Sequence, residues 1–168
     1  MDDLITGSIL LVLAVILFPV FARARENARR SSCQSNLRQL HVALRQYAAD
    51  YDGQLPVTEC ATSLKAYTKR SSTFRCPSKG SRTGASDYFF NARFLKKKLG
   101  DIPSPQTLVL MGDGNDGAPL TQLPSAWPTD EYSPAWRHMN GANYGFADGH
   151  VKWLEPGRVA PDLRMVNR

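Results

Sequence analysis

The chain has 168 residues, a formal net charge of +6 and 42% hydrophobic residues. This length allows one small domain beside any long helix, and no internal repeat or low-complexity tract is present. The sequence lacks the motifs of a serine-hydrolase elbow, a phosphate-binding loop and a zinc-protease helix, so we expect a protein that is not an enzyme.

An unbroken apolar segment, Leu4–Ala22, lies at the amino end and contains no charged residue. About 20 apolar residues suffice to cross the hydrocarbon core of a bilayer as a helix. A helix also satisfies its own backbone hydrogen bonds there. Two alternatives are a cleaved secretory signal, which the preceding Asp2 and Asp3 disfavour, and a buried core helix, which the lack of a polar face disfavours. We therefore predict a transmembrane or filament-core helix at residues 1–22.

A helical pattern continues beyond this segment. Apolar residues recur at steps of three and four, which is typical of one stripe of an amphipathic helix: Cys33, Leu37, Leu40, Leu44, Tyr47 and Tyr51. Asp52-Gly53 and Pro56 end the pattern. We predict an amphipathic continuation at 23–52 that docks on a globular head at 53–168, a kink at Pro19, and a position for His41 at the boundary of the stripe.

The head is expected to contain a short helix or strand at Thr62–Thr68, a strand at Asp87–Asn91 and a buried central strand at Thr107–Met111. The Gly- and Pro-rich segment Gly112–Pro134 indicates a long loop. Together these elements predict an α+β fold, with a long kinked helix packed on a small antiparallel sheet.

A β-hairpin is predicted around Asp148-Gly149, because this dipeptide lies between two alternating segments. A two-residue turn would pair Ala147 with His150. That register places four aromatic or apolar side chains on one face as a cover for the helix: Tyr144, Phe146, Val151 and Trp153.

Near the carboxy end, His138 is followed after nine residues by Asp148-Gly149, which makes a His-x9-Asp-Gly signature. Five further segments carry a characteristic sequence: Phe18–Arg29, Ser32–Leu40, Asp50–Gly53, Cys76–Ser78 and Gly145–Val151. Together these segments resemble type IV pilin-like proteins and type II secretion pseudopilins, in the subgroup with a prepilin-type amino end and this carboxy-terminal signature.

This resemblance implies a structural subunit of a pilus-like filament or a pseudopilus, anchored in the inner membrane with its head outside the cytoplasm. Its partners would be copies of itself, other pilin-like subunits and lipid. Pro19 matches the family's kink proline, and Asp2 stands where the family has a glutamate that pairs with a neighbour's terminal amine. The family's basic leader and Gly-Phe cleavage site are absent before Met1, so either the start is truncated or the chain is anchored without a prepilin peptidase. Counted alone, the four arginines after the apolar segment would keep the head in the cytoplasm.

A divalent metal is the one cofactor that we consider. His138, Asp148 and His150, with Asp113, carry the ligand types of a transition-metal site, although local structural roles explain them as well. Two further functions stay open: a nucleic-acid-binding pilin-like protein, using the basic excess, and a membrane-anchored metal-binding protein.

The three cysteines allow two interpretations. Cys60 and Cys76 flank a 15-residue segment and would close a short disulfide loop in an oxidising compartment, or else remain thiols. Cys33 lies on the apolar stripe, where we expect it to pack as a small hydrophobe.

Overall fold

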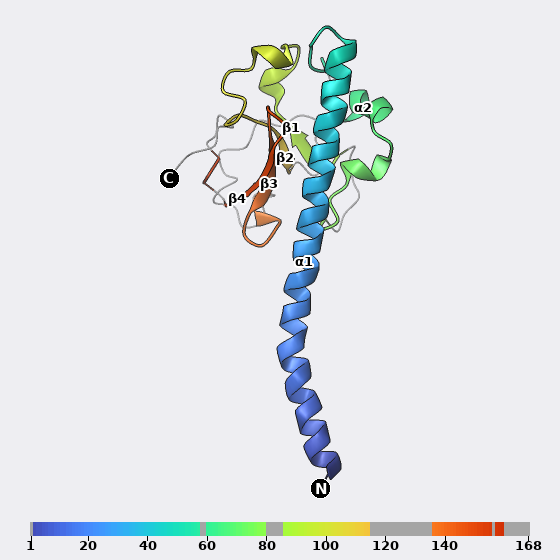
Figure 1. Ribbon diagram of the computed structural model, residues 1–168, viewed down its shortest axis with the longest axis vertical. Coiled ribbons are helices and arrows are strands. Elements are labelled where there is room, and N and C mark those ends of the chain that lie inside the picture. Colours follow the sequence, from blue (N-terminus) through green and yellow to red (C-terminus); the bar gives the residue numbers. More distant parts are fainter. Residues whose placement is uncertain (1, 58–59, 80–85, 115–135, 156, 160–168) are drawn as a thin grey trace.

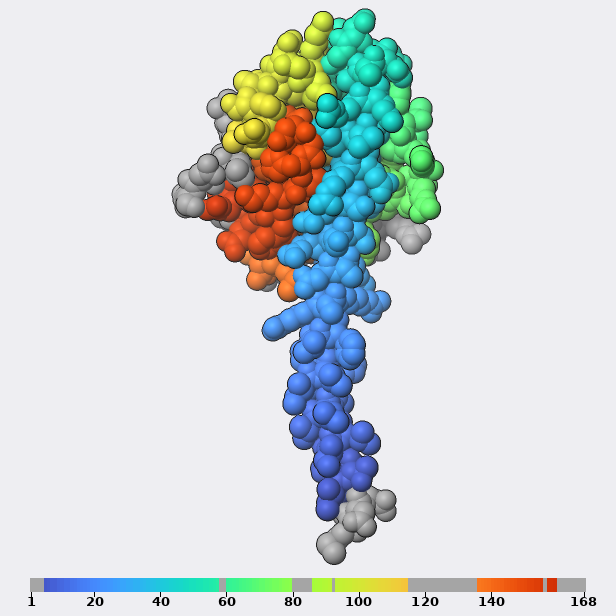
Figure 2. Space-filling view, in the orientation of Figure 1, coloured from blue at the N-terminus to red at the C-terminus, as the bar shows by residue number. Residues whose placement is uncertain are grey.

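The computed structural model describes residues 2–57, 60–79, 86–114, 136–155 and 157–159, without the side chains of residues 2–4 and 92. One long helix, α1 (Asp2–Asp50), runs from a free lower end into a head built from the rest of the chain. The space-filling view shows a narrow stalk and a broad head (Figures 1 and 2).

The two parts of α1 differ in what surrounds them. Every side chain from residue 5 to residue 25 is exposed, whereas Cys33, Leu37 and Leu40 are fully buried. The helix passes through Pro19 without interruption. At about 1.5 Å per residue, its 49 residues extend over roughly 70 Å.

Four antiparallel strands form one sheet in the order β1-β2-β3-β4. The strands are β1 (Tyr88–Phe90), β2 (Val109–Asp113), β3 (Ala142–Phe146) and β4 (Val151–Leu154). The expected α+β fold is therefore confirmed, and the predicted central strand corresponds to the fully buried β2.

Short helices complete the described part of the head. The predicted helix or strand at Thr62–Thr68 is a helix, α2 (Cys60–Leu64), continued by the 3-10 turn η1 (Lys65–Tyr67). Three further 3-10 turns are η2 (Ser71–Phe74), η3 (Ala92–Phe94) and η4 (Leu99–Asp101). Most of the predicted loop Gly112–Pro134 lies outside the described residues.

Both faces of the sheet carry apolar clusters. The face toward α1 packs Tyr88, Phe90 and Met111 with the buried stripe of the helix. The other face carries Phe89 and Phe146, with neighbours that include no residue of α1. Burial on both faces explains why β1 and the first three residues of β2 have no alternating polar residue.

The β3–β4 hairpin corrects the predicted register by one residue. Gly145 pairs with Val151 and Asn143 with Trp153, so the turn contains three residues rather than two. Gly149 adopts a φ of +102°, and its N–H donates to the carbonyl of Phe146 at 3.0 Å. Such a left-handed glycine after a turn adds one residue to a hairpin loop. Tyr144 and Phe146 pack on the face away from α1, opposite to the prediction, whereas Val151 packs against the cluster on the α1 face. The shifted register thus separates Tyr144 and Phe146 from Val151.

His41 is also placed differently from expectation. It is buried, with 4% of its surface exposed, rather than lying at the boundary of the stripe. The hairpin turn covers it, since a Cβ on Gly149 would lie 2.8 Å from the His41 ring.

Candidate functional site

Residues 5–25 of α1 lie outside the head and form the free part, or stalk, of the helix. Up to Ala22, this part presents an apolar surface on all sides. Its large hydrophobic side chains are between 47% and 80% exposed: Ile5, Ile9, Leu10, Leu11, Val12, Leu13, Val15, Ile16, Leu17, Phe18, Val20 and Phe21. Ser8 turns its hydroxyl back to the carbonyl of Ile5 at 2.8 Å. This segment is long and apolar enough to cross a membrane, as a membrane anchor or a signal sequence does.

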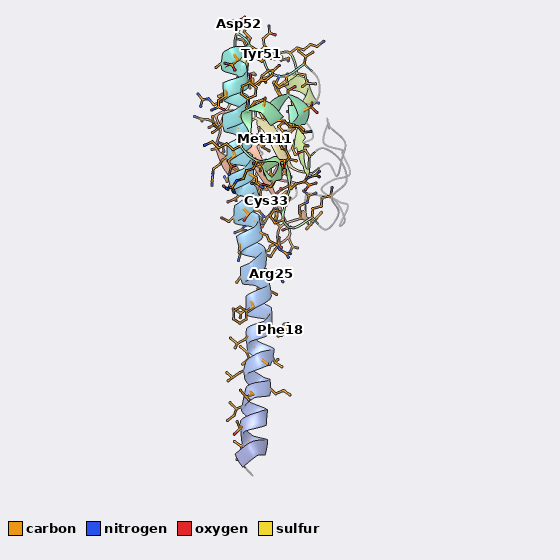
Figure 3. All side chains as sticks on the ribbon, turned by 90° about the vertical axis from the view of Figure 1, so that its right-hand side faces the viewer. Phe18, Arg25, Cys33, Tyr51, Asp52 and Met111 are labelled. Atoms are coloured by element: carbon orange, nitrogen blue, oxygen red, sulfur yellow. The ribbon has the colours of Figure 1, made fainter. Side chains whose placement is uncertain are left out.

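The helix enters the head through charged contacts just above this surface. In Figure 3, Phe18 and Arg25 lie on the free part, and Cys33 lies at the lower edge of the head. The guanidinium of Arg30 sits over the Trp153 ring, 5.5 Å from its centroid. Glu26 pairs with Arg29 at 3.6 Å and also reaches residues of the head.

A buried polar centre lies where α1 meets the sheet. Cys33 comes from α1, Cys76 from the segment after η2, Asp113 from the end of β2 and His138 from the segment before β3. One potential ligand atom from each residue lies within 4.8 Å of the other three. Each of the four residues is at most 3% exposed.

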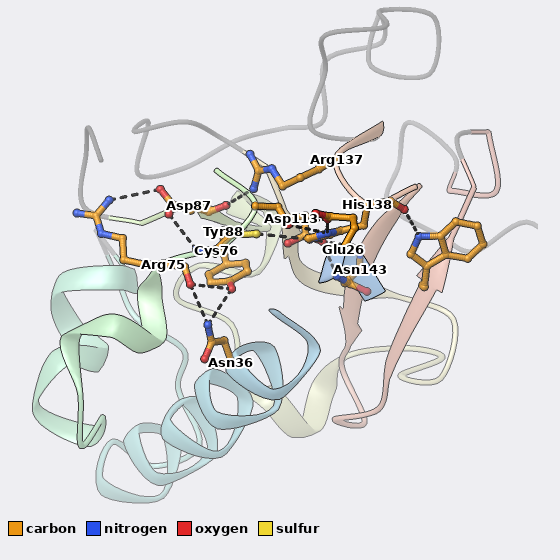
Figure 4. A network of polar contacts seen from close by, with 12 residues as sticks. Glu26, Asn36, Arg75, Cys76, Asp87, Tyr88, Asp113, Arg137, His138 and Asn143 are labelled. Carbon is orange, nitrogen blue, oxygen red and sulfur yellow. Dashed lines mark hydrogen bonds and ion pairs between the residues drawn. The ribbon is translucent and has the colours of Figure 1, made fainter. Parts of the chain in front are cut away.

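His138 lies at the middle of this centre (Figure 4). Its Nε2 is 3.4 Å from Sγ of Cys76 and 3.3 Å from Oδ2 of Asp113. Its Nδ1 is 2.9 Å from Oε1 of Glu26, which also accepts a 2.6 Å hydrogen bond from Ser78. The imidazole therefore connects the helix to the sheet through both ring nitrogens.

The backbone around His138 holds the ring in place. The His138 N–H donates to the carbonyl of Gly141 at 2.8 Å, and its carbonyl accepts from Nε1 of Trp153 at 2.8 Å. Met139 and Asn140 have φ values of 52° and 66°, so the chain turns sharply after the histidine. This turn fits because Gly141 has no side chain: a Cβ there would lie 2.5 Å from the Trp153 ring.

Asp113 is held by Asn143 on the neighbouring strand. Oδ2 of Asp113 accepts hydrogen bonds from the backbone N–H of Asn143 at 2.7 Å and from its Nδ2 at 2.8 Å. Oδ1 of Asp113 is buried and has no hydrogen-bond partner among the described residues.

Cys76 is positioned by a second carboxylate. Its backbone N–H donates to Oδ2 of Asp87 at 2.9 Å, while Oδ1 of Asp87 pairs with Arg75 at 3.3 Å and Lys79 at 3.2 Å. Asn36 of α1 donates to the carbonyl of Arg75 at 2.8 Å. These contacts fasten the Cys76 segment to the helix (Figure 4).

The groups of the centre alter one another's protonation. The hydrogen bond with Cys33, together with His138, lowers the pKa of Cys76 to about 6, although burial and Asp113 act in the opposite direction. The same bond and burial raise the pKa of Cys33. Burial lowers the pKa of His138, but hydrogen bonds with Asp113 and Cys76 outweigh it and raise the value to about 10. Without a bound cation, the arrangement thus favours a thiolate–imidazolium pair.

The structure brings together only some of the predicted metal ligands. His138 and Asp113 meet in the buried centre, but Asp148 and His150 are not part of it. They pair with each other instead: Nδ1 of His150 lies 2.6 Å from Oδ1 of Asp148 in the hairpin turn, and both are partly exposed. The predicted four-residue set is therefore wrong as a group, because the hairpin holds its last two members in a separate local contact.

The cysteines also differ from the disulfide interpretation. All three are thiols, so Cys60 and Cys76 are not paired in the structure. The side chain of Asp2, expected to pair with a neighbouring subunit, lies outside the described residues.

Sequence reasoning missed Cys33, Cys76 and Glu26 as members of the centre. The separation of Glu26 and Cys33 by seven residues, two helical turns, was the available signal, since it places both on one side of α1. Cys76 offered no such signal, because its partners are distant in the sequence.

Comparison with known families gives one match. Residues 22–69 match the family SBP_bac_10, described as a protein of unknown function (DUF1559). This family is associated with pilin-like, prepilin-type proteins, and the apolar amino-terminal helix fits that association. No curated protein and no solved structure matches the chain. The match covers the docked part of α1 and extends into α2 and η1, and the signature from His138 to Gly149 lies outside it.

Proposed function

We propose that this protein is a structural subunit of a type IV pilus-like filament or a type II secretion pseudopilus. The observation that carries the proposal is the free part of α1, where residues 5–25 are exposed throughout and none belongs to the buried core of the described head. A contiguous apolar surface of this extent needs a covering, and its cylindrical form suits lipid or a bundle of identical helices.

The proposed subunit has two environments. Before assembly the apolar part of α1 spans the inner membrane, with the head outside the cytoplasm; in the filament the same surface packs against sibling helices. The arginines that follow the apolar segment lie at headgroup level in the membrane state. The chain acts in this proposal as a structural component rather than an enzyme.

A charge-insertion experiment tests the proposal. Replacing Val12 and Ile16 together by lysine places two charges within the apolar surface, where each costs about 2.5–3.5 kcal/mol at a membrane centre. Val42 and Val57 are also exposed, but they belong to the head region rather than to the free part of α1. Replacing these two residues together by lysine is the matched control, because it adds the same charge outside the apolar surface.

We expect the stalk variant to leave the membrane fraction and to abolish filaments recovered by shearing, while the control keeps both. Protease added to spheroplasts should digest the wild-type head. Digestion of the head only after the membrane has been lysed would contradict the proposed topology. A wild-type chain that is monodisperse in water without detergent would contradict the proposal as a whole.

A further inference from the structure

The buried centre has the donor set of a closed metal site. Two sulfurs, one imidazole nitrogen and one carboxylate oxygen converge from four separate segments of the chain. Sites with four protein ligands of these types and no open position are typical of structural zinc.

Two of the six ligand–ligand distances match the edges of a tetrahedron. With metal–ligand bonds of about 2.3 Å to sulfur and 2.0–2.1 Å to nitrogen or oxygen, tetrahedral edges are about 3.6 Å between nitrogen and sulfur and about 3.3 Å between nitrogen and oxygen. The corresponding separations are 3.4 Å for His138–Cys76 and 3.3 Å for His138–Asp113. No pair of ligand atoms exceeds 4.8 Å, about 1 Å beyond the edge of about 3.8 Å expected between two sulfurs.

The chemistry of the surrounding groups points the same way. The Glu26 carboxylate at Nδ1 of His138 favours a proton on that nitrogen, so Nε2, which faces Asp113 and Cys76, is the nitrogen that would give up its proton to a metal. Oδ1 of Asp113 is buried and has no hydrogen-bond partner among the described residues. A buried carboxylate with an unpartnered oxygen is costly, and a cation bound to the Asp113 carboxylate would offset the charge that its two oxygens share.

We propose that Cys33, Cys76, Asp113 and His138 bind one zinc ion in a closed structural site that fastens α1 to the head. This site is independent of the filament role and adds a metal requirement to the fold.

The surrounding contacts suit such a site. A ligating histidine usually donates its second N–H to a carboxylate or carbonyl, and Glu26 provides that acceptor at 2.9 Å. Asn143 fixes the Asp113 carboxylate with two hydrogen bonds, and Asp87 fixes the backbone of Cys76. Zinc binding requires both sulfurs as thiolates and Nε2 without its proton, so metal uptake releases protons and weakens in acid.

The first experiment measures metal content in the full-length chain, purified in detergent micelles under reducing conditions. We expect about one zinc per chain by elemental analysis. Replacement by Co²⁺ should give the thiolate-to-cobalt charge-transfer bands and the intense visible bands of a tetrahedral centre. Chelation should lower the thermal unfolding temperature, and added Zn²⁺ should restore it.

Cysteine variants separate this site from adventitious metal binding. Cys76→Ser should abolish the cobalt bands and the response to zinc, whereas Cys60→Ser should keep both. The two positions are matched, because Cys60 is also a buried thiol, 4% exposed, but is outside the centre.

Two further variants keep the proposal testable if Cys76→Ser fails to fold. Asp113→Asn preserves shape and should abolish or shift the cobalt bands. Glu26→Gln leaves the four ligands in place, changes the carboxylate that contacts His138, Ser78 and Arg29, and should weaken zinc affinity about 10–100-fold. The proposal is overturned if the wild-type chain takes up no zinc or cobalt, or if Cys60→Ser loses metal as completely as Cys76→Ser.

Discussion

Single residues decide how closely the segments of the head approach one another. Gly141 lets the turn after His138 lie against β4, and Gly149 lets the hairpin turn lie against His41. Each of these contacts needs a residue without a side chain, and at Gly149 the positive φ adds a second requirement.

Replacing Gly141 by alanine should destabilise the head by about 1–3 kcal/mol. The new Cβ would lie 2.5 Å from the Trp153 ring and 2.7 Å from the carbonyl oxygen of Leu154, and the second contact is with backbone. Gly100→Ala is the matched control, because nothing lies within 4 Å of a Cβ there. Equal unfolding temperatures for the two variants would contradict the packing described for the turn.

The burial of His41 leads us to expect that the free energy of unfolding decreases in acid. Burial, with a smaller contribution from Arg45, lowers the pKa of His41 below its usual 6.5, and Asp148 opposes this only in part. The unfolded chain therefore binds a proton more readily than the folded one. The contribution of His41 to the free energy of unfolding is therefore fully present above about pH 6.5. It decreases as the pH falls toward the lowered pKa of His41 in the folded chain.

His41→Leu should consequently flatten the stability profile below pH 6.5 relative to wild type. Chemical denaturation at a series of pH values measures this difference. Parallel profiles for the two proteins would show that His41 is not the group responsible.

At the scale of elements, α1 is one helix with two kinds of partner. Its docked part presents the buried stripe to the sheet face that carries Tyr88, Phe90 and Met111. Its free part has no apolar partner within the described chain. The division between these parts follows from the pattern of side chains, since the helical backbone itself is continuous.

Leu44→Asp should detach the docked part of α1 from the head. Leu44 is 3% exposed, and an unpaired carboxylate there would cost several kcal/mol. Val42→Asp is the control on the same turn, because Val42 is 55% exposed. Thermal unfolding and hydrogen exchange along α1 measure the effect, and unchanged exchange in Leu44→Asp would contradict the docking.

For the whole molecule, the contrast between stalk and head determines solubility. The head packs both faces of its sheet, while the stalk exposes only apolar side chains over residues 9–18. Removing the stalk should therefore change the state of the protein in water without changing the structure of the head.

A chain that begins at Glu26 should be soluble and monomeric without detergent. It should unfold within a few degrees of the full-length protein in micelles, because residues 5–25 make no buried contact and Glu26 keeps its bond to His138. Size-exclusion chromatography and thermal unfolding measure the two properties. An aggregated or unfolded product would show that the head depends on the stalk.

Features that depend on local sequence pattern can be predicted for this chain without its structure. The uncharged segment Leu4–Ala22 indicates a lipid- or bundle-facing helix, and the stripe from Cys33 to Leu44 indicates a docked continuation. Period and composition suffice here, because a helix places neighbours three and four residues apart on one face whatever else the chain does. The apolar run before Gly112 likewise indicated the buried strand β2.

The hairpin register and the buried centre depend instead on contacts between distant parts of the chain. The backbone conformation of Gly149, supported by the packing of the turn on His41, accommodates one more residue in the loop, and the resulting register places Val151 on the opposite face from Tyr144 and Phe146. Cys33, Cys76, Asp113 and His138 belong to four segments with no characteristic spacing, so no local pattern connects them. They meet because α1 crosses the sheet where β2 ends and β3 begins, and long-range packing of this kind leaves no trace in neighbouring residues.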